Sequence, residues 1–152
     1  MDTRGTVQDG LEVGHRLMAA GEYELAIRAF YRSAADEGLS TDVLSGLGSA
    51  NLQLGRLVQA ERLLRTAVEK EPDFAQAWNN LGVVLMERGK SQEAVLVFRR
   101  AFALSDGEND QIRDNLVLAL AKIENPDYNP PQANDYKLVR RGSSDFLIRA
   151  TP

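Results

Sequence analysis

The sequence predicts an all-α protein made of stacked helix hairpins, and the main evidence is a period of 34 residues. Three columns of small residues repeat in phase over three copies: Gly14, Gly48 and Gly82; Gly21, Gly55 and Gly89; Ala26, Ala60 and Ala94. Within each copy the apolar residues follow the spacing of amphipathic helices. A fixed period of this length is typical of stacked arrays, in which each unit buries its apolar face only against its neighbours. Such arrays present a binding surface, so we expect a binding protein rather than an enzyme.

Each period divides into two helices at its second glycine. In the third copy, helical spacing covers Ala75–Glu87 and Ser91–Leu104, and Gly89 lies between them. Glycine commonly follows the last turn of a helix because it adopts a positive φ without a steric penalty. At the start of this copy, Asp73 with Gln76 resembles a capping box, which would begin the helix.

The remaining columns predict how the two helices of a copy pack. Large residues recur on both helices, and small residues alternate with them: Val13, Leu47 and Leu81; Phe30, Leu64 and Phe98; Gly14, Gly48 and Gly82; Ser33, Ala67 and Ala101. Glycine inside a helix costs about 1 kcal/mol relative to alanine. Three helical glycines at one phase therefore predict that the backbones of the two helices approach closely.

At these positions the chain resembles the tetratricopeptide repeat family. The family pattern of tryptophan, leucine, glycine, tyrosine, glycine, alanine, aromatic residue and alanine is matched in the third copy by Trp78, Leu81, Gly82, Leu85, Gly89, Ala94, Phe98 and Ala101. The second copy departs mainly at Asn51, and the first is looser, with Gly10 in the tryptophan column. The resemblance implies a right-handed superhelical array of three helix hairpins. Its repeats are expected at about residues 7–40, 41–74 and 75–108, within a domain of residues 1–125.

A further helix at about residues 109–124 is expected to cap the array. Asn115 and Leu116 echo Asn80 and Leu81 at a spacing of 35 residues, so the period slips by one here. Apolar residues lie on more sides of this helix than a one-sided cap needs. The additional ones are Val117, Leu118 and Ala121. We expect another part of the chain to cover them.

The tail, residues 126–152, begins with a proline-containing stretch that excludes a continuing helix. Two apolar segments then predict a β-hairpin within residues 136–149. With a turn at Gly142 and Ser143, the expected pairs are Val139 with Phe146 and Arg140 with Asp145. We favour a tail that is ordered against the capping helix. A mobile tail, and strands that pair with another chain, are the alternatives.

Composition and charge exclude several other classes. The chain has 152 residues, of which 43% are hydrophobic and 26% charged, as in an ordinary folded domain. The net charge of −4 comes without a basic cluster, so nucleic acid is not an expected partner. No segment has the unbroken apolar stretch of a membrane span or a signal peptide. With no cysteine, the redox state of the compartment leaves no mark on the sequence, and localisation stays open.

No catalytic or metal site is expected. The chain has one histidine, His15, and no cysteine, so a nucleophile would lack a partner at a fixed spacing. The carboxylates are spread as single helix positions, such as Glu61 and Glu93, rather than clustered as metal ligands. The glycines lack the strand-to-helix setting and the lysine of a phosphate loop. We therefore expect no cofactor and no bound metal.

The family resemblance places the binding surface on the first helix of each hairpin, whose exposed side lines the concave groove. The lining positions combine aliphatic, methionine, amide and hydroxyl side chains, which suit an extended peptide or an amphipathic helix. They are Leu11, His15, Met18, Asp42, Ser45, Ser49, Leu52, Gln76, Asn79, Val83 and Met86. Among them, Gln76 and Asn79 can hydrogen-bond a peptide backbone. For Leu52, Val83 and Met86, contact with the next repeat is an equally good interpretation.

Family members that bind chaperones grip a C-terminal carboxylate with lysine, arginine and asparagine in the groove. The matching positions here are Leu11, His15, Gly46, Gln76 and Asn80. Asn80 alone fits. Capture of a carboxylate needs cationic donors, so a co-chaperone role is not expected.

The expected function is a non-enzymatic adaptor that binds a peptide or helix of a protein partner in the groove. Val13–Leu104 and the Leu138–Gly142 segment also resemble the small repeat lipoproteins of bacterial tight-adherence (Flp) pilus systems. That resemblance implies an assembly factor in the periplasm or at the outer membrane, whose signal peptide and lipidated cysteine would precede Met1. The alternative is a cytoplasmic regulatory scaffold that forms homo-oligomers through the capping helix and tail.

Overall fold

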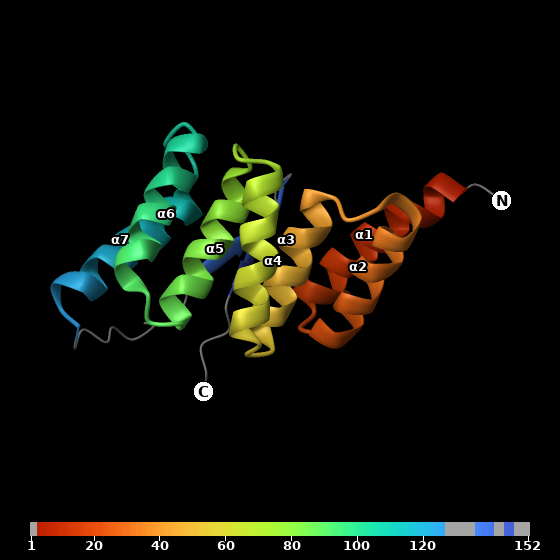
Figure 1. Ribbon diagram of the computed structural model, residues 1–152, viewed down its shortest axis with the longest axis horizontal. Coiled ribbons are helices and arrows are strands. Elements are labelled where there is room, and N and C mark those ends of the chain that lie inside the picture. Colours follow the sequence, from red (N-terminus) through yellow and green to blue (C-terminus); the bar gives the residue numbers. More distant parts are fainter. Residues whose placement is uncertain (1–2, 127–135, 142–144, 148–152) are drawn as a thin grey trace. The chain divides into compact units, whose positions relative to one another are not determined.

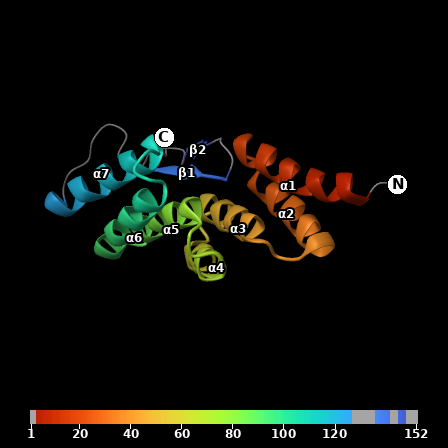
Figure 2. The same ribbon diagram turned by 90° about the horizontal axis from the view of Figure 1, so that it is seen from above.

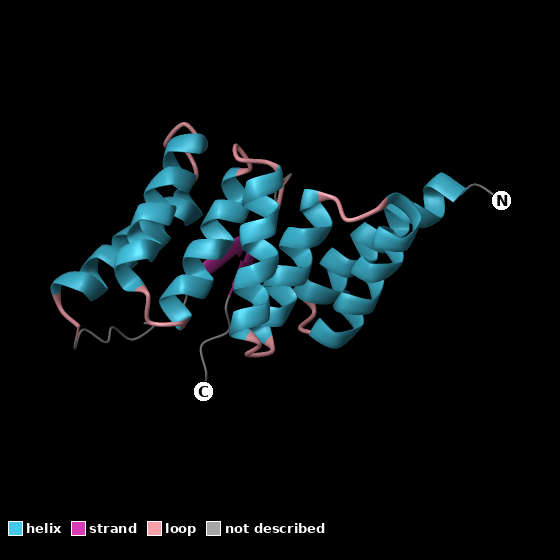
Figure 3. Ribbon diagram, in the orientation of Figure 1, coloured by secondary structure: helices cyan, strands magenta, loops and turns pink. Residues whose placement is uncertain are grey.

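The computed structural model describes residues 3–126, 136–141 and 145–147, and these residues have the predicted all-α architecture (Figure 1). They form seven helices, and two short strands lie in the tail (Figure 3). The chain divides into two compact units, Met1–Lys70 and Glu71–Pro152. Each unit is described by itself.

The first unit consists of two helix hairpins. Its helices are α1 (Thr3–Ala19), α2 (Tyr23–Glu37), α3 (Thr41–Gln53) and α4 (Leu57–Lys70). Each of these helices packs against the next one along the chain. The N-cap of α3 is Ser40, whose side-chain oxygen accepts a hydrogen bond from the Val43 N–H at 3.2 Å.

The second unit consists of one helix hairpin, a further helix and the described part of the tail. Its elements are α5 (Ala75–Glu87), α6 (Ser91–Leu104), α7 (Asp110–Glu124), β1 (Lys137–Val139) and β2 (Asp145–Leu147). The two helices of the third repeat are confirmed at both predicted ends. The capping helix is also confirmed, with Asn109 as its N-cap. Helix α6 packs between α5 and α7, and β1 lies against α5 and α7 (Figure 2).

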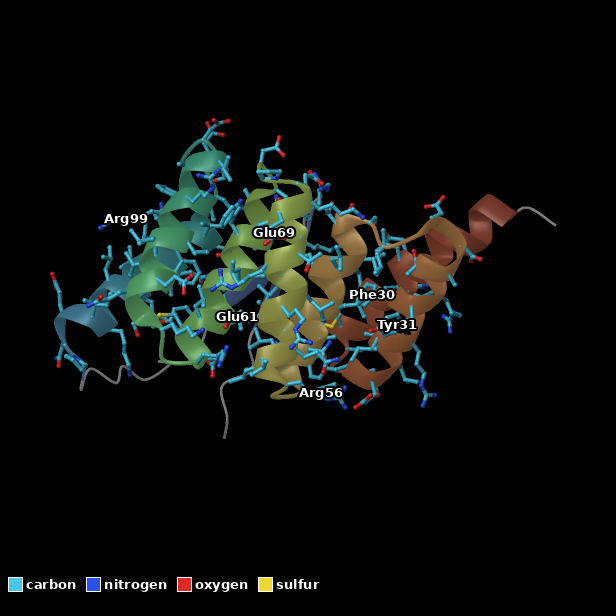
Figure 4. All side chains as sticks on the ribbon, viewed as in Figure 1. Phe30, Tyr31, Arg56, Glu61, Glu69 and Arg99 are labelled. Carbon is cyan, nitrogen blue, oxygen red and sulfur yellow. The ribbon has the colours of Figure 1, made fainter. Side chains whose placement is uncertain are left out.

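The predicted close approach of the helices is confirmed by the glycine column. A Cβ atom added to Gly14, Gly48 or Gly82 would lie 2.4, 2.5 or 2.5 Å from the side chains of Phe30, Leu64 and Phe98, respectively. Such distances are far below van der Waals contact, so only glycine fits opposite these large residues. Figure 4 labels Phe30 on α2 beside Tyr31. Phe30 is fully buried, whereas its neighbour Tyr31 is 51% exposed.

The predicted capping box at the start of α5 is wrong. The N-cap is Phe74, one residue after Asp73, and no side chain caps this end of the helix. A hydrogen-bonded turn replaces the box: the Phe74 N–H donates to the Glu71 carbonyl oxygen at 3.0 Å, and Trp78 Nε1 donates to the Pro72 carbonyl oxygen at 2.8 Å. Burial of the Phe74 ring decides where the helix begins, because it gains more than an exposed Asp73 cap would supply.

The predicted β-hairpin is present, but its register is shifted by one residue. The observed pairs are Lys137 with Leu147, Leu138 with Phe146 and Val139 with Asp145, so the predicted pairs of Val139 with Phe146 and Arg140 with Asp145 are wrong. The strand ends at Val139, two residues before Arg141, whose side chain contacts Glu71 and Phe74. The predicted turn residues Gly142 and Ser143 lie outside the described residues.

The described tail packs mainly against α5 and less against α7, whereas we expected it on the capping helix. The reason is that α5 supplies two asparagines that hydrogen-bond the strand, Asn79 and Asn80, whereas α7 supplies one, Asn115. The described part of the chain also leaves Val117 of α7 59% exposed, so the expectation that the tail covers this residue is wrong. Single exposed aliphatic side chains are common on protein surfaces.

Candidate functional site

Strand β1 is held against α5 by an asparagine that binds both polar groups of one backbone residue. The Nδ2 of Asn80 donates to the Val139 carbonyl oxygen at 2.9 Å, and its Oδ1 accepts from the Val139 N–H at 3.0 Å. Asn80 is 1% exposed, so these backbone groups are satisfied where water is excluded. A side-chain amide thus takes the place of a neighbouring strand.

Asn115 of α7 binds Lys137 in the same way. Its Nδ2 donates to the Lys137 carbonyl oxygen at 2.7 Å, and its Oδ1 accepts from the Lys137 N–H at 2.8 Å. Asn79 joins the two contacts, because its Nδ2 lies 2.8 Å from the Lys137 carbonyl oxygen and 3.1 Å from Asn80 Oδ1. Its own Oδ1 accepts from Asn115 Nδ2 at 2.8 Å. We call Asn79, Asn80 and Asn115 the asparagine cluster.

The asparagine cluster occupies one edge of β1 and leaves the other edge to β2. In an extended strand the N–H and C=O of one residue point to one edge, and those of the next residue point to the other. Lys137 and Val139 therefore face the cluster, and Leu138, between them, faces Phe146 in β2. The hydrogen bonds described above join the cluster to backbone atoms of the strand, which an extended segment of any sequence presents.

Side-chain burial and hydrogen bonds both contribute to the free energy that holds β1. Leu138 and Val139 are both buried, and Val139 packs in a cluster with Ala101 and Ile112. Burying one such side chain stabilises by about 1.5–3 kcal/mol. An intramolecular hydrogen bond contributes about 0.5–1.5 kcal/mol net. The two buried side chains together contribute about 3–6 kcal/mol and the five hydrogen bonds about 2.5–7.5 kcal/mol, so both determine the strength of the attachment, and the asparagine cluster also determines its position.

A second contact lies just beyond the strand, where Arg141 meets the turn before α5. Its Nη2 lies 2.8 Å from each carboxylate oxygen of Glu71, and its guanidinium carbon lies 4.0 Å from the centre of the Phe74 ring. At the other end, Lys137 Nζ lies 3.4 Å from Asp114 Oδ2. Both ion pairs are partly exposed, so each contributes modestly. Together they give the site an acidic rim that faces a basic segment.

The phenol of Tyr136 begins this segment and stacks on Phe98, with ring centres 6.0 Å apart and planes at 6°. Two causes raise the pKa of Tyr136 from its ordinary value of 10.0 to about 12: burial, which is the larger, and the negative charge of Glu87. Because the folded state disfavours the phenolate, docking of Tyr136 is fully stabilising below pH 10 and weakens as the pH rises towards 12.

We therefore expect one of the four tyrosines to ionise near pH 12 in an ultraviolet absorbance titration. The step should vanish in Tyr136→Phe and persist in the exposed control Tyr31→Phe. Ionisation of every tyrosine near pH 10 would contradict the docking of Tyr136.

The predicted groove residue Asn79 lies in this site and hydrogen-bonds an extended backbone, as its residue type suggested. Of the other predicted residues in the second unit, Val83 is fully buried, and Gln76 and Met86 are half-buried. No hydrogen bond between these three residues and β1 is found among the described residues. They remain proposed lining residues.

The predicted residues of the first unit are mostly covered in this structure. The buried ones are His15, Met18, Ser45, Ser49 and Leu52, and the half-buried ones are Leu11 and Asp42. The imidazole of His15 packs edge-on against the ring of Phe30, with centres 5.3 Å apart and an angle of 70°. This contact gives His15 a packing role on α1.

Sequence reasoning did not predict that four residues would hold the tail: Asn80, Asn115, Glu71 and Phe74. The signal for the first two was present, because Asn80 and Asn115 are the residues that echo each other at a spacing of 35. We used that echo to locate the capping helix. Glu71 and Phe74 carry no such signal, since their role depends on Arg141, which lies 70 residues after Glu71.

The described residues contain no group of three histidine, cysteine, aspartate or glutamate side chains placed to hold a metal ion. Within the same residues, no helix has both the length and the apolar character that crossing a membrane requires.

Comparison with known proteins identifies the repeats. Two family models, both described as tetratricopeptide repeat, match residues 17–83 and 59–109. The small glutamine-rich tetratricopeptide repeat-containing protein 2 of Mycosarcoma maydis is 27% identical over 132 residues, which are 87% of this chain and 36% of that protein. The chain spans between 15% and 36% of the length of the curated relatives it matches.

Solved structures share the fold. The Sgt2 repeat domain from Aspergillus fumigatus has a TM-score of 0.73 and 22% identity, over 82% of this chain and 85% of that chain. The first repeat domain of Spaghetti (RPAP3), bound to the HSP90 peptide SRMEEVD, has a TM-score of 0.72 and 18% identity, over 79% of this chain and 97% of that chain. At these identities the likeness concerns the fold.

Proposed function

The chain belongs to the tetratricopeptide repeat family, and from that premise we propose that it is a non-enzymatic adaptor that binds an extended segment of a protein partner. The observation that carries the proposal is the asparagine cluster. It binds both polar groups of alternate backbone residues in an extended strand, and this is the contact that an extended peptide needs.

The peptide held by the similar RPAP3 domain supports the class of ligand. The mode of binding is expected to differ, because the positions that grip a terminal carboxylate in chaperone-binding members lack lysine and arginine here. Leu11, His15 and Gln76 provide no fixed positive charge for that purpose. We therefore propose that the partner contributes an internal segment rather than its C-terminus. Of the predicted lining residues, Gln76, Val83 and Met86 of the second unit are proposed to extend the contact with the partner.

Selection of peptides by the full chain tests this function. We expect a displayed library of ten-residue peptides, selected against the full chain carrying Leu138→Asp and Val139→Asp so that its own strand does not compete, to yield binders whose affinity falls about tenfold or more when Asn115→Ala is added, because a buried backbone group loses its partner. N-methylation of one peptide amide at a time should abolish binding at alternate positions. The matched control is Gln111→Ala on the same helix, which should leave binding unchanged when it is added instead. Failure to select any peptide, or equal binding by Asn115→Ala, would refute the proposal.

A more specific role, assembly of a bacterial tight-adherence pilus, is supported by the sequence resemblance of Val13–Leu104 and of the segment that begins at Leu138. None of the relatives named above is a pilus protein. The gene sequence upstream of Met1 decides between this role and a cytoplasmic scaffold. A signal sequence that ends in cysteine supports the pilus role, and its absence removes that role.

A further inference from the structure

The second unit holds residues 136–141 of its own chain in the way that the proposed function assigns to a partner peptide. We call these residues the tail segment. We propose that the tail segment is an internal ligand, and that the partner carries the same chemistry: two adjacent aliphatic residues, followed two positions after the second by arginine. The proposal rests on the function proposed above and specifies its ligand.

The site exists apart from the covalent link to the tail. Its groups come from α5, α7 and the turn before α5, and its backbone contacts join residues that are 22 to 59 positions apart. Two of its groups are fixed by contacts within the site, because Asn115 Nδ2 donates to Asn79 Oδ1 and Asn79 Nδ2 to Asn80 Oδ1. A segment from another molecule would make the same contacts.

The aliphatic pair is selected by burial. Leu138 is fully buried. Val139 is 2% exposed and packs against Ala101 and Ile112. A charged or polar side chain at either place would be desolvated without a described partner, which is costly. The two subsites therefore accept leucine, valine or similar residues.

Arginine is selected by the pair of Glu71 and Phe74. The Glu71 carboxylate meets one guanidinium nitrogen with both oxygens at 2.8 Å, while the Phe74 ring lies under the guanidinium plane at 4.0 Å. A lysine ammonium cannot stack on a ring as a planar group, so it would use half of this site. The turn is ordered before any ligand arrives, because Phe74 and Trp78 hydrogen-bond to the backbone of Glu71 and Pro72. We call Glu71 and Phe74 the arginine subsite.

Because the tail segment and the site belong to the same chain, the tail segment competes with a partner peptide. A ligand on the same chain competes intramolecularly, at an effective concentration that commonly reaches the order of millimolar. A partner binds the fraction of molecules in which the tail segment is released, so its apparent affinity falls by that fraction. A partner therefore displaces the tail segment only if its own contacts with the site are better than those of the tail segment.

The experiment uses the intact chain and a labelled peptide with the sequence of residues 136–141, Tyr-Lys-Leu-Val-Arg-Arg. In a detached-tail variant, Leu138→Asp with Val139→Asp, the tail segment loses its buried contacts and the site itself is unchanged. Fluorescence anisotropy should show the peptide binding at least about tenfold tighter to this variant than to the wild type. Circular dichroism checks that the helices persist. Arg141→Gln, a single exposed change, provides a milder second variant, which should bind the peptide a few times tighter than the wild type.

The specificity arm compares peptides in which the last arginine is replaced by lysine or glutamine. On the detached-tail variant, the arginine peptide should bind about fivefold tighter than either, and Glu71→Gln should reduce its advantage over the glutamine peptide while leaving the part that stacking on Phe74 contributes. Glu108→Gln, an exposed carboxylate in the same unit, is the matched control and should preserve the whole advantage.

Each failure has a separate meaning. Equal binding of the three peptides would overturn the arginine subsite while leaving peptide binding, and hence the adaptor function, intact. Wild-type binding as tight as that of both variants would overturn the internal ligand. Absence of binding to every variant would also overturn it, and the library selection would then decide the adaptor function independently.

Discussion

Gly82→Ala should lower the free energy of unfolding by about 1–3 kcal/mol, the usual cost of overpacking a core. Helix propensity alone predicts the opposite, a gain of about 1 kcal/mol, because alanine is the better helix former. Steric overlap decides the sign of this change in the free energy of unfolding. A Cβ atom at residue 82 would lie 2.5 Å from Cε1 of Phe98 and within 2.9 Å of two further ring atoms, and both residues are fully buried in the packed second unit.

A double-mutant cycle in denaturant-induced unfolding isolates this contact. Phe98→Ala alone should cost about 3–5 kcal/mol, as is typical for a buried phenylalanine. The combination with Gly82→Ala should cost less than the sum, because removing the ring also removes the overlap.

Gly89→Ala is the control for the glycine column. A Cβ there meets nothing within 4 Å, but the residue has a φ of 77°, so it should cost about 1–2 kcal/mol without coupling to Phe98. A stabilising Gly82→Ala, or strict additivity with Phe98→Ala, would show that the close approach of α5 and α6 does not constrain the sequence.

Asn80→Ala should release β1 from α5 and leave the helices folded. The substitution removes the partners of both the N–H and the C=O of Val139, which are buried, and each unsatisfied buried group costs about 1–3 kcal/mol. Local opening of the strand should therefore become about a hundredfold or more frequent. Hydrogen exchange of the Val139 amide, followed by nuclear magnetic resonance, measures this opening directly.

The matched control for Asn80→Ala is Gln76→Ala, a half-buried amide on the same helix. It should leave exchange at Val139 unchanged, whereas Asn115→Ala should accelerate exchange at Lys137. Trypsin provides a second readout, since released tail residues Lys137 and Arg140 become cleavable. Unchanged protection of Val139 in Asn80→Ala would mean that burial of side chains alone holds the strand.

The helical part of the fold could be predicted in detail from the sequence, because its determinants are local. The bounds of α5 and α6 follow from apolar spacing and from Gly89, whose φ of 77° ends the first helix of the hairpin. The prediction that failed in this region, the capping box at Asp73, involved a choice between a local hydrogen bond and the burial of Phe74. Burial cannot be evaluated before the partners are known.

The candidate site could be predicted only in part. Asn79 was expected to bind a peptide backbone because amides on the inner helix of a repeat have that capacity; its Nδ2 donates to the Lys137 carbonyl oxygen of the chain's own tail, and binding of a partner peptide stays a prediction. Asn80 and Asn115 belong to the same cluster, yet their residue type does not reveal that both face one strand. The hairpin register was wrong because it was inferred from the turn residues alone, whereas in the structure β1 is also held by Asn80 and Asn115, which lie far from it in the sequence.

The sequence by itself thus determined the repeat, the helices and the pairs of glycine and large side chain within each hairpin. These features depend on residues a few positions apart or in the same hairpin, where helical geometry imposes the contact. Only the tertiary structure decided that the tail segment lies against α5 and α7. That position depends on hydrogen bonds between residues 22 to 59 positions apart and on the orientation of three amide groups, which no periodicity in the sequence encodes.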